Sequence, residues 1–129
     1  MKLDLYQINA FSYEPFGGNP AAVVFLEQWL PETIMQRIAQ ENALAETAFL
    51  VIENDHFRIR WFTPEIEMDL CGHATLAAAY ALVHYRGYQH HMVHFSSASG
   101  DLKVLIKDNP IYSGLPLTTA NGIGIARNH

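Results

Sequence analysis

The chain has little cysteine, little positive charge and no long apolar run. Its single cysteine, Cys71, among 129 residues excludes an internal disulfide and favours a reducing, cytoplasmic location. Eight scattered Lys and Arg against thirteen Asp and Glu give a net charge of −5, which argues against nucleic acid as a partner. The Ala-rich segment after His73 is too short to span a bilayer, so we also expect no membrane partner.

The residues that are present suffice for one compact domain, because half of them are hydrophobic and a chain of this length can bury a core. Alternating or short apolar runs predict strands, and longer periodic or continuous apolar patterns predict helices. The expected strands cover residues 3–11, 21–26, 46–52, 57–63, 92–96 and 102–106, and the expected helices cover residues 31–42 and 72–86. Because hairpins outnumber βαβ crossovers, we predict an α+β fold in which a mixed, curled, barrel-like sheet wraps around the second helix.

The C-terminal segment does not follow this pattern. Residues 109–129 contain two prolines, three glycines and a single charged residue, Arg127. Their apolar residues are separated by turn-forming residues, so the pattern predicts neither a strand nor a helix there. We therefore divide the chain into a domain of residues 1–108 and an atypical tail of residues 109–129.

The helix that starts near Gly72 is the most informative element. Between Ala74 and Tyr85 it has no Asp, Glu, Lys or Arg, and a helix that is apolar on every side belongs in a protein interior. Its N-terminal end, with Gly72 and His73, must then open out of the core. The free backbone N–H groups of such an end suit an anion such as a carboxylate.

Glu46 is a lone carboxylate at the start of an apolar strand. A carboxylate that is shielded from water holds its proton more tightly, which suits a general acid or base at neutral pH. The alternative is a strand-end glutamate that faces water and has no role.

His73 and Cys71 also have two readings each. His73 can bind a substrate or orient Glu46, or it can simply cap the helix. Cys71 can act as a nucleophile or a base, because a helix N-terminus lowers a thiol pKa, or it can be small filler in the core.

Metal and nucleotide sites are not supported. His84, His90, His91 and His94 are close in sequence, but no two lie four apart on one helix and Gly87 interrupts them, so we predict no metal. The segment Gly17-Gly18-Asn19-Pro20 is not followed by the residues of a phosphate-binding loop.

Five short segments together resemble one family, and they occur in the family's order over residues 3–106. The chain resembles the N-terminal half of the PhzF-type, phenazine-biosynthesis-like isomerases in the segments Phe16-Gly17-Gly18-Asn19-Pro20-Ala21-Ala22-Val23-Val24, Ala45-Glu46-Thr47-Ala48-Phe49, Arg60-Trp61-Phe62-Thr63-Pro64, Asp69-Leu70-Cys71-Gly72-His73-Ala74-Thr75 and Ser99-Gly100-Asp101-Leu102.

The resemblance implies a diaminopimelate-epimerase-like fold, in which two similar domains each wrap a sheet around a central helix and share a cleft. It implies no metal and no organic cofactor. Glu46 matches the glutamate that moves a proton on the substrate, and Gly72 and His73 match the residues that hold the substrate carboxylate and polar groups. Asn19 and Cys71 are further candidate substrate contacts. The best-known member isomerises a dihydro-hydroxyanthranilate, so the expected substrate is a small carboxylic acid.

The chain departs from the family pattern where a second domain is expected, and the tail resembles a truncated or frame-shifted end. We therefore expect an isomerase whose activity is impaired. One alternative is a racemase or epimerase that uses Cys71 as a base, and another is a non-catalytic remnant. Because an apolar domain face without its partner favours self-association, we also expect a homodimer.

Overall fold

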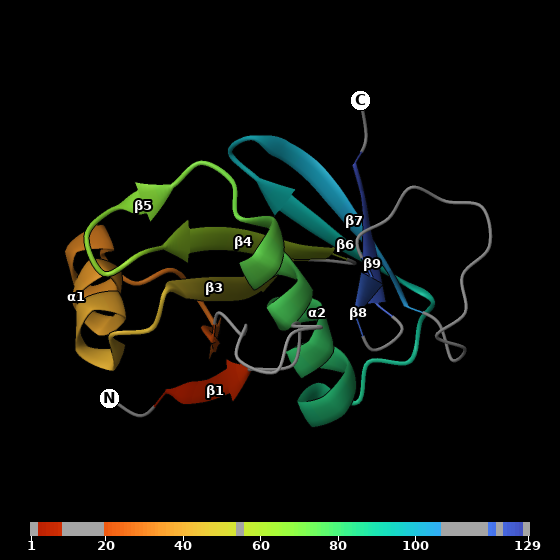
Figure 1. Ribbon diagram of the computed structural model, residues 1–129, viewed down its shortest axis with the longest axis horizontal. Helices are drawn as coiled ribbons and strands as arrows, with labels where there is room; N and C mark the ends of the chain where they lie inside the picture. The colour runs from red at the N-terminus through yellow and green to blue at the C-terminus, as the bar shows by residue number, and fades with distance from the viewer. Residues whose placement is uncertain (1–2, 9–19, 54–55, 107–118, 121–122, 128–129) are drawn as a thin grey trace.

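The computed structural model describes residues 3–8, 20–53, 56–106, 119–120 and 123–127. Its two helices are separated by strands, and both lie within one unit (Figure 1). In chain order the elements are β1 (Asp4–Ile8), β2 (Ala21–Leu26), α1 (Glu32–Asn42), β3 (Glu46–Glu53), β4 (His56–Phe62), β5 (Glu67–Met68), α2 (Gly72–Arg86), β6 (Met92–Ser97), β7 (Gly100–Ile106), β8 (Thr119–Ala120) and β9 (Ile123–Arg127).

The strands form one mixed sheet in the order β1-β2-β3-β4-β6-β7-β9-β8, with β5 paired to β4. The pairs β2–β3 and β4–β6 are parallel, and the other pairs are antiparallel. Helix α2 contacts β1, β2 and β3 near one edge and β7 and β9 near the other, so the sheet curls around it (Figure 1). The predicted α+β fold with a mixed sheet around a central helix is confirmed, although the sheet of the described strands does not close into a barrel.

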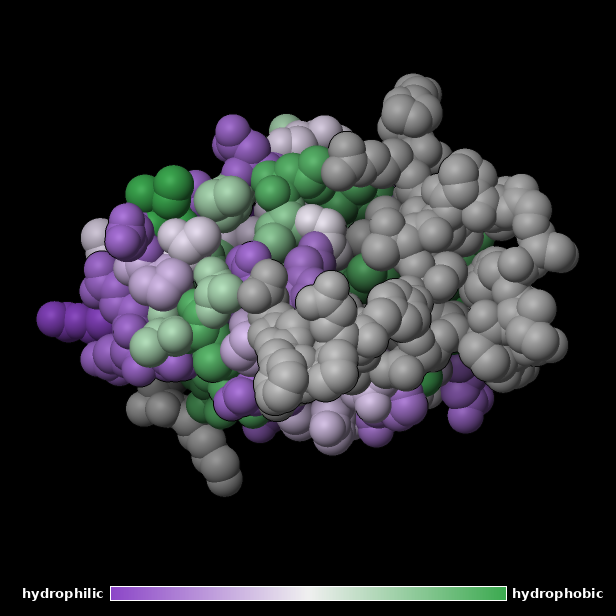
Figure 2. Space-filling view, viewed as in Figure 1, coloured by the Kyte–Doolittle hydropathy of each residue, from purple (hydrophilic) through white to green (hydrophobic). Residues whose placement is uncertain are grey.

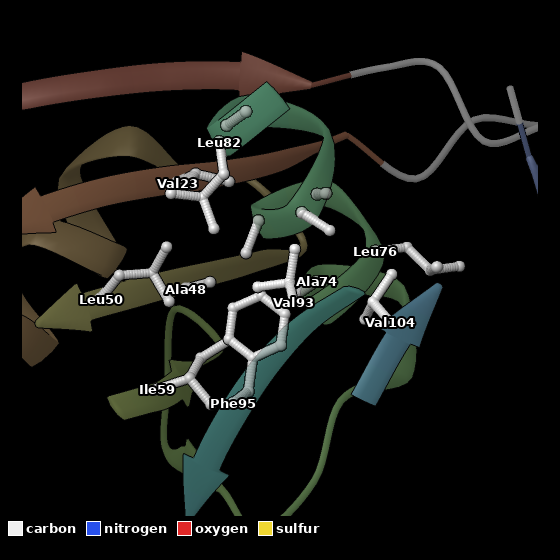
Figure 3. Packing of buried hydrophobic residues seen from close by; sticks show 14 of the residues in the cluster. Val23, Ala48, Leu50, Ile59, Ala74, Leu76, Leu82, Val93, Phe95 and Val104 are labelled. Carbon is white, nitrogen blue, oxygen red and sulfur yellow. The ribbon is translucent and has the colours of Figure 1, made fainter. Parts of the chain in front are cut away.

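Helix α2 forms the centre of the core. Eight of its residues from Ala74 to Leu82 are buried, and they lie on all sides of the helix. Figure 3 shows Ala74, Leu76 and Leu82 packed among strand residues such as Val23 and Phe95. Five small alanines let the strands approach closely, and the absence of charge in the sequence is thereby explained by burial.

The alternation of β3 decides which residues face α2. Ala48 and Leu50 belong to the core around α2, whereas Phe49 and Val51 belong to a second, smaller core with Met35 of α1. Side chains two apart on a strand share a face. Glu46 therefore starts the row that faces α2, and the sheet separates it from α1.

Helix α1 packs on the outer face of the sheet. Figure 2 shows hydrophilic residues gathered over this end of the molecule. Arg60 of β4 anchors the helix from below: its Nε and Nη2 donate to the two carboxylate oxygens of Glu67 at 2.6 and 2.7 Å, and Nη2 also donates to Glu32 at 3.0 Å. The hydrogen bonds from Arg60 lower the pKa of the Glu67 carboxyl, and in return Glu67 raises the pKa of Arg60.

Both helices end in the left-handed region. Gly87, at φ 70°, follows α2, and the Tyr88 N–H donates to the Leu82 carbonyl at 3.0 Å, which completes a Schellman-type cap. Helix α1 is followed by Ala43 at φ 56°. No helix in the described ranges is long and apolar enough to cross a membrane.

Two regions differ from the prediction. The short strand β5 was not among the expected strands: Glu67 and Met68 pair with Phe62 and Trp61. The tail was expected to hold no strand, and this was wrong: residues 123–127 pair with residues 102–106. Glycine lowers the strand propensity of this short segment, and the hydrogen bonds that compensate come from β7, which local sequence does not reveal.

Candidate functional site

The sequence segments that resemble the family meet at the N-terminal end of α2. Glu46 begins β3, and Ala21 of β2 lies beside it in register. Trp61 lies at the end of β4, one strand away from Glu46. Cys71 is the residue that precedes the first turn of α2. Segments that are up to 50 residues apart in the sequence are therefore gathered around one helix end.

The turn before β3 sets the position of Glu46. Asn42, the last residue of α1, accepts a hydrogen bond from the Leu44 N–H through its Oδ1 at 3.1 Å and donates from Nδ2 to the Thr47 hydroxyl at 3.1 Å. Thr47 is buried, and by strand alternation it shares the face of Phe49 and Val51, away from α2. Because neighbouring residues on a strand point to opposite faces, this anchoring of Thr47 turns Glu46 toward α2.

The carboxylate of Glu46 lies against the thiol of Cys71. Burial first, and then the negative charge and hydrogen bond of Glu46, raise the pKa of this thiol to about 11 against the opposing effect of the Ala74 and His73 amides. The thiol is therefore protonated at neutral pH. The Oε2 atom of Glu46 is shielded from solvent and accepts no hydrogen bond of good geometry from the described residues.

Gly72 and His73 follow Cys71 directly and form the first turn of α2. Both are half-buried. The Thr75 N–H donates to the Cys71 carbonyl at 3.1 Å and so ties the first turn of α2 to Cys71. The structure thus brings together four of the five predicted site residues, namely Glu46, Cys71, Gly72 and His73. Asn19 lies outside the described residues.

Two contacts at this helix end were not predicted. The Trp61 indole N–H donates to the Thr75 hydroxyl at 3.0 Å, and that hydroxyl donates to the Cys71 carbonyl at 2.7 Å. The Ser99 hydroxyl, at the tip of the β6–β7 hairpin, donates to the Asp69 carbonyl at 2.5 Å. Both pairs belong to segments that resemble the family, and that shared membership was the only signal in the sequence.

Comparison with known proteins decides the family. Residues 8–118 match the family described as phenazine biosynthesis-like protein, PhzC-PhzF. The chain belongs to this family. An uncharacterized isomerase of Pseudomonas aeruginosa is 44% identical in an alignment of 129 positions that covers 95% of this chain and 50% of that protein. The chain spans about half the length of the curated relatives it matches.

Solved structures of the same family share the fold. A PhzF-family protein of Enterococcus faecalis is 54% identical with a TM-score of 0.79, over 84% of this chain and 42% of that chain. A predicted epimerase of Pseudomonas aeruginosa is 30% identical with a TM-score of 0.71, over 80% of this chain and 38% of that chain. The predicted resemblance to PhzF-type proteins is therefore confirmed.

In this PhzF-like chain the gathered groups suit proton transfer next to an anion. The positive end of α2 favours a carboxylate, and Glu46 offers a carboxylate oxygen that the described residues leave without a hydrogen bond. The protonated Cys71 thiol is a hydrogen-bond donor and a poor base. Within the described parts of the chain, no three His, Cys, Asp or Glu side chains gather as metal ligands.

A groove of about 680 Å³ lies elsewhere, at the C-terminal end of α2. Apolar side chains such as Leu26, Leu50 and Leu82 line it, together with Arg86 and Tyr88. It contains none of the residues that the family resemblance assigns to a site. We therefore place the candidate site at the helix end that gathers polar groups and not at the groove.

Proposed function

We propose that this chain carries the proton-transferring side of a PhzF-like isomerase that needs no metal or organic cofactor. In this proposal Glu46 takes a proton from one carbon of a small carboxylic acid and returns it to another, next to a double bond or carbonyl. The Gly72 amide and His73 hold the substrate carboxylate at the start of α2, with Cys71 and Asn19 beside it.

One observation carries the proposal: a solvent-shielded carboxylate oxygen of Glu46 lies at the N-terminal end of a buried helix, against Cys71. A proton-transfer group must lie within hydrogen-bond reach of an anchored substrate, and a helix N-terminus is such an anchor. The racemase alternative is less well supported, because it requires the Cys71 thiolate at neutral pH, and burial with the nearby carboxylate opposes that charge.

The other side of the substrate site is also a proposal. The longer relatives contain a second half, and we propose that a unit like it completes the cleft and aligns the substrate, since orientation supplies much of catalysis. A second copy of this chain is our proposed substitute, as a homodimer. Activity of the chain by itself is then expected to be low, and a cytoplasmic location remains our prediction.

Proton exchange in deuterated water tests the function. The chain is incubated with dihydro-hydroxyanthranilate and with a panel of small unsaturated carboxylic acids, and loss of C–H signals is followed by NMR. We expect slow exchange at the carbon next to the double bond, and none with Glu46→Gln. Exchange that persists in Glu46→Gln would remove Glu46 from its role.

Association is measured in parallel by sedimentation at micromolar concentration. A dimer that exchanges substrate protons supports the shared-cleft form of the proposal. A stable monomer that exchanges protons in none of the acids on the panel contradicts activity of this chain and favours the non-catalytic alternative.

A further inference from the structure

Trp61 and Thr75 form a buried polar pair that the proposed chemistry does not touch. The Trp61 side chain is 2% exposed and Thr75 is fully buried. The indole N–H donates to the Thr75 hydroxyl at 3.0 Å, and the hydroxyl donates to the Cys71 carbonyl at 2.7 Å. The pair therefore connects β4 to the backbone of the residue that precedes α2.

Core stability alone does not require these polar groups. Replacing both partners of a buried hydrogen bond by apolar groups of the same shape costs little; Val has nearly the shape of Thr, whereas Phe is an apolar but smaller side chain than Trp. A helical threonine often bonds the carbonyl four residues earlier. Here the hydroxyl also accepts the indole N–H from a neighbouring strand, and this second bond gives the helix end a defined position.

The position of Trp61 relates this bond to Glu46. Trp61 lies directly opposite Ala48 in the β3–β4 register, and Ala48 is two residues from Glu46 on the same face of β3. Strand β3, strand β4 and the first turn of α2 thus contact one another in a ring. The hydrogen-bonded pair closes it on one side, and the contact between Cys71 and Glu46 closes it on the other.

We propose that Trp61 and Thr75 are positioning residues of the candidate site: their hydrogen bonds hold the first turn of α2, with the Cys71 thiol and the Gly72 amide, at a fixed place beside Glu46. The catalytic value of this positioning rests on the proposed function, but the positioning itself is measured without any substrate. A chain that turns nothing over can still show it.

Cys71 reports on the position, because it is the only cysteine in the sequence. Its alkylation by iodoacetamide is measured against pH under native conditions, and the rate follows the thiolate fraction and access. In Thr75→Val we expect water to reach the thiol and its apparent pKa to fall by about one unit, which is about a tenfold faster reaction at pH 8. Trp61→Phe should act in the same direction.

Two matched variants separate positioning from stability. Thr75→Ser keeps the hydroxyl and should alkylate within about twofold of the parent chain. Ile59→Val lowers stability from the same strand, since Ile59 is buried beside Trp61 on one face, but it leaves the hydrogen bonds intact and should not move the profile. Unchanged profiles in Thr75→Val and Trp61→Phe would overturn the proposal, as would an equal shift in Ile59→Val.

Hydrogen exchange tests the same bond in the unaltered chain, so a variant that fails to fold does not leave the proposal open. The sequence has two tryptophans, and Trp29 is only half-buried. We expect the Trp61 indole proton to exchange at least about a hundredfold more slowly than that of Trp29, because a buried bonded proton exchanges only on opening. Equal rates would overturn the proposal.

Discussion

The two ends of α2 differ in chemistry although they belong to one buried helix. At the N-terminal end, polar groups are buried or half-buried and contact one another: Glu46, Cys71, Thr75 and Trp61. At the C-terminal end, Arg86 is partly exposed, pairs with Asp4 at 2.7 Å and lies 4.3 Å over the Phe25 ring.

Because of this difference, the groove and the groups suited to chemistry lie at different ends of α2. The groove of about 680 Å³ lies at the C-terminal end, where the helix dipole is negative and favours the positive charge of Arg86 in the last turn. The N-terminal end has the polarity that an anionic substrate needs. The groove and the polar groups that suit an anionic substrate therefore lie at opposite ends of the same helix.

The largest expected effect is on isomerase activity, and it is tested by replacing one carboxylate with an amide at each end of α2. Glu46→Gln should lower any isomerase activity by at least about a hundredfold, because an amide cannot carry the proton. Glu27→Gln is the matched control, since Glu27 is exposed and lines the groove, and it should leave activity unchanged. Substrate turnover is compared at equal folded concentration, judged by circular dichroism. The reverse result would move the active end to the groove.

Shortening Leu82, which lines the groove, should lower the stability of the fold and leave the candidate site unchanged. Leu82 is buried at the C-terminal end of α2, and Leu82→Ala should lower the free energy of unfolding by about 2–5 kcal/mol, because a buried cavity remains. Urea unfolding measures this loss. The pH profile of Cys71 alkylation in the folded variant should match that of the parent chain. A shifted profile would show that the two ends are coupled.

Alkaline pH should weaken the N-terminal end through Cys71. The folded-state pKa of this thiol is raised from 9.0 to about 11, so its contribution to stability is present below pH 9 and is lost between pH 9 and 11. Because the thiol is partly open to water, we expect a loss of about 1 kcal/mol. Stability is measured from pH 8 to 11 in the parent chain and in Cys71→Ala. An identical decline in both would contradict the raised pKa.

The smallest expected effect concerns the charged pair at the C-terminal end. Arg86→Ala should lower stability by about 0.5–1 kcal/mol, since it removes a surface ion pair and a cation–π contact. The loss should shrink as salt is added. Arg58→Ala is the control, because Arg58 pairs with Glu53 at 3.6 Å and both side chains are about half exposed, and its effect should be near zero. Equal losses would show that the ring contact with Phe25 contributes nothing.

Much of the fold could be predicted from local patterns. Helix α2 was predicted from the absence of charge between Ala74 and Tyr85, because only burial explains a helix without a polar face. The strands β3 and β4 were predicted as two short apolar-rich runs, with bounds within one residue of those in the structure. The candidate site residues Glu46, Gly72 and His73 were identified by resemblance, and the structure brings Glu46 to the helix end that Gly72 and His73 begin.

Other features depended on contacts between distant residues. Strand β9 exists because β7 offers hydrogen bonds along an open edge, and nothing within residues 123–127 shows that partner. The two-residue strand β5 likewise forms by pairing with β4, where Arg60 also binds Glu67. These features are decided by long-range pairing, which can outweigh weak local propensity.

The sequence by itself determined that this protein buries a helix and opens the positive end of that helix out of the core. The reason is that a segment without charged residues is stable only where it is shielded from water. It also determined which residue types are available for chemistry: one cysteine, a lone glutamate before an apolar strand, and a glycine with a histidine before an apolar helix. Only the tertiary structure decided that Glu46 meets Cys71 and that Trp61 reaches Thr75. Those meetings depend on strand register and on the curl of the sheet, and both arise from packing across the whole domain rather than from any single segment.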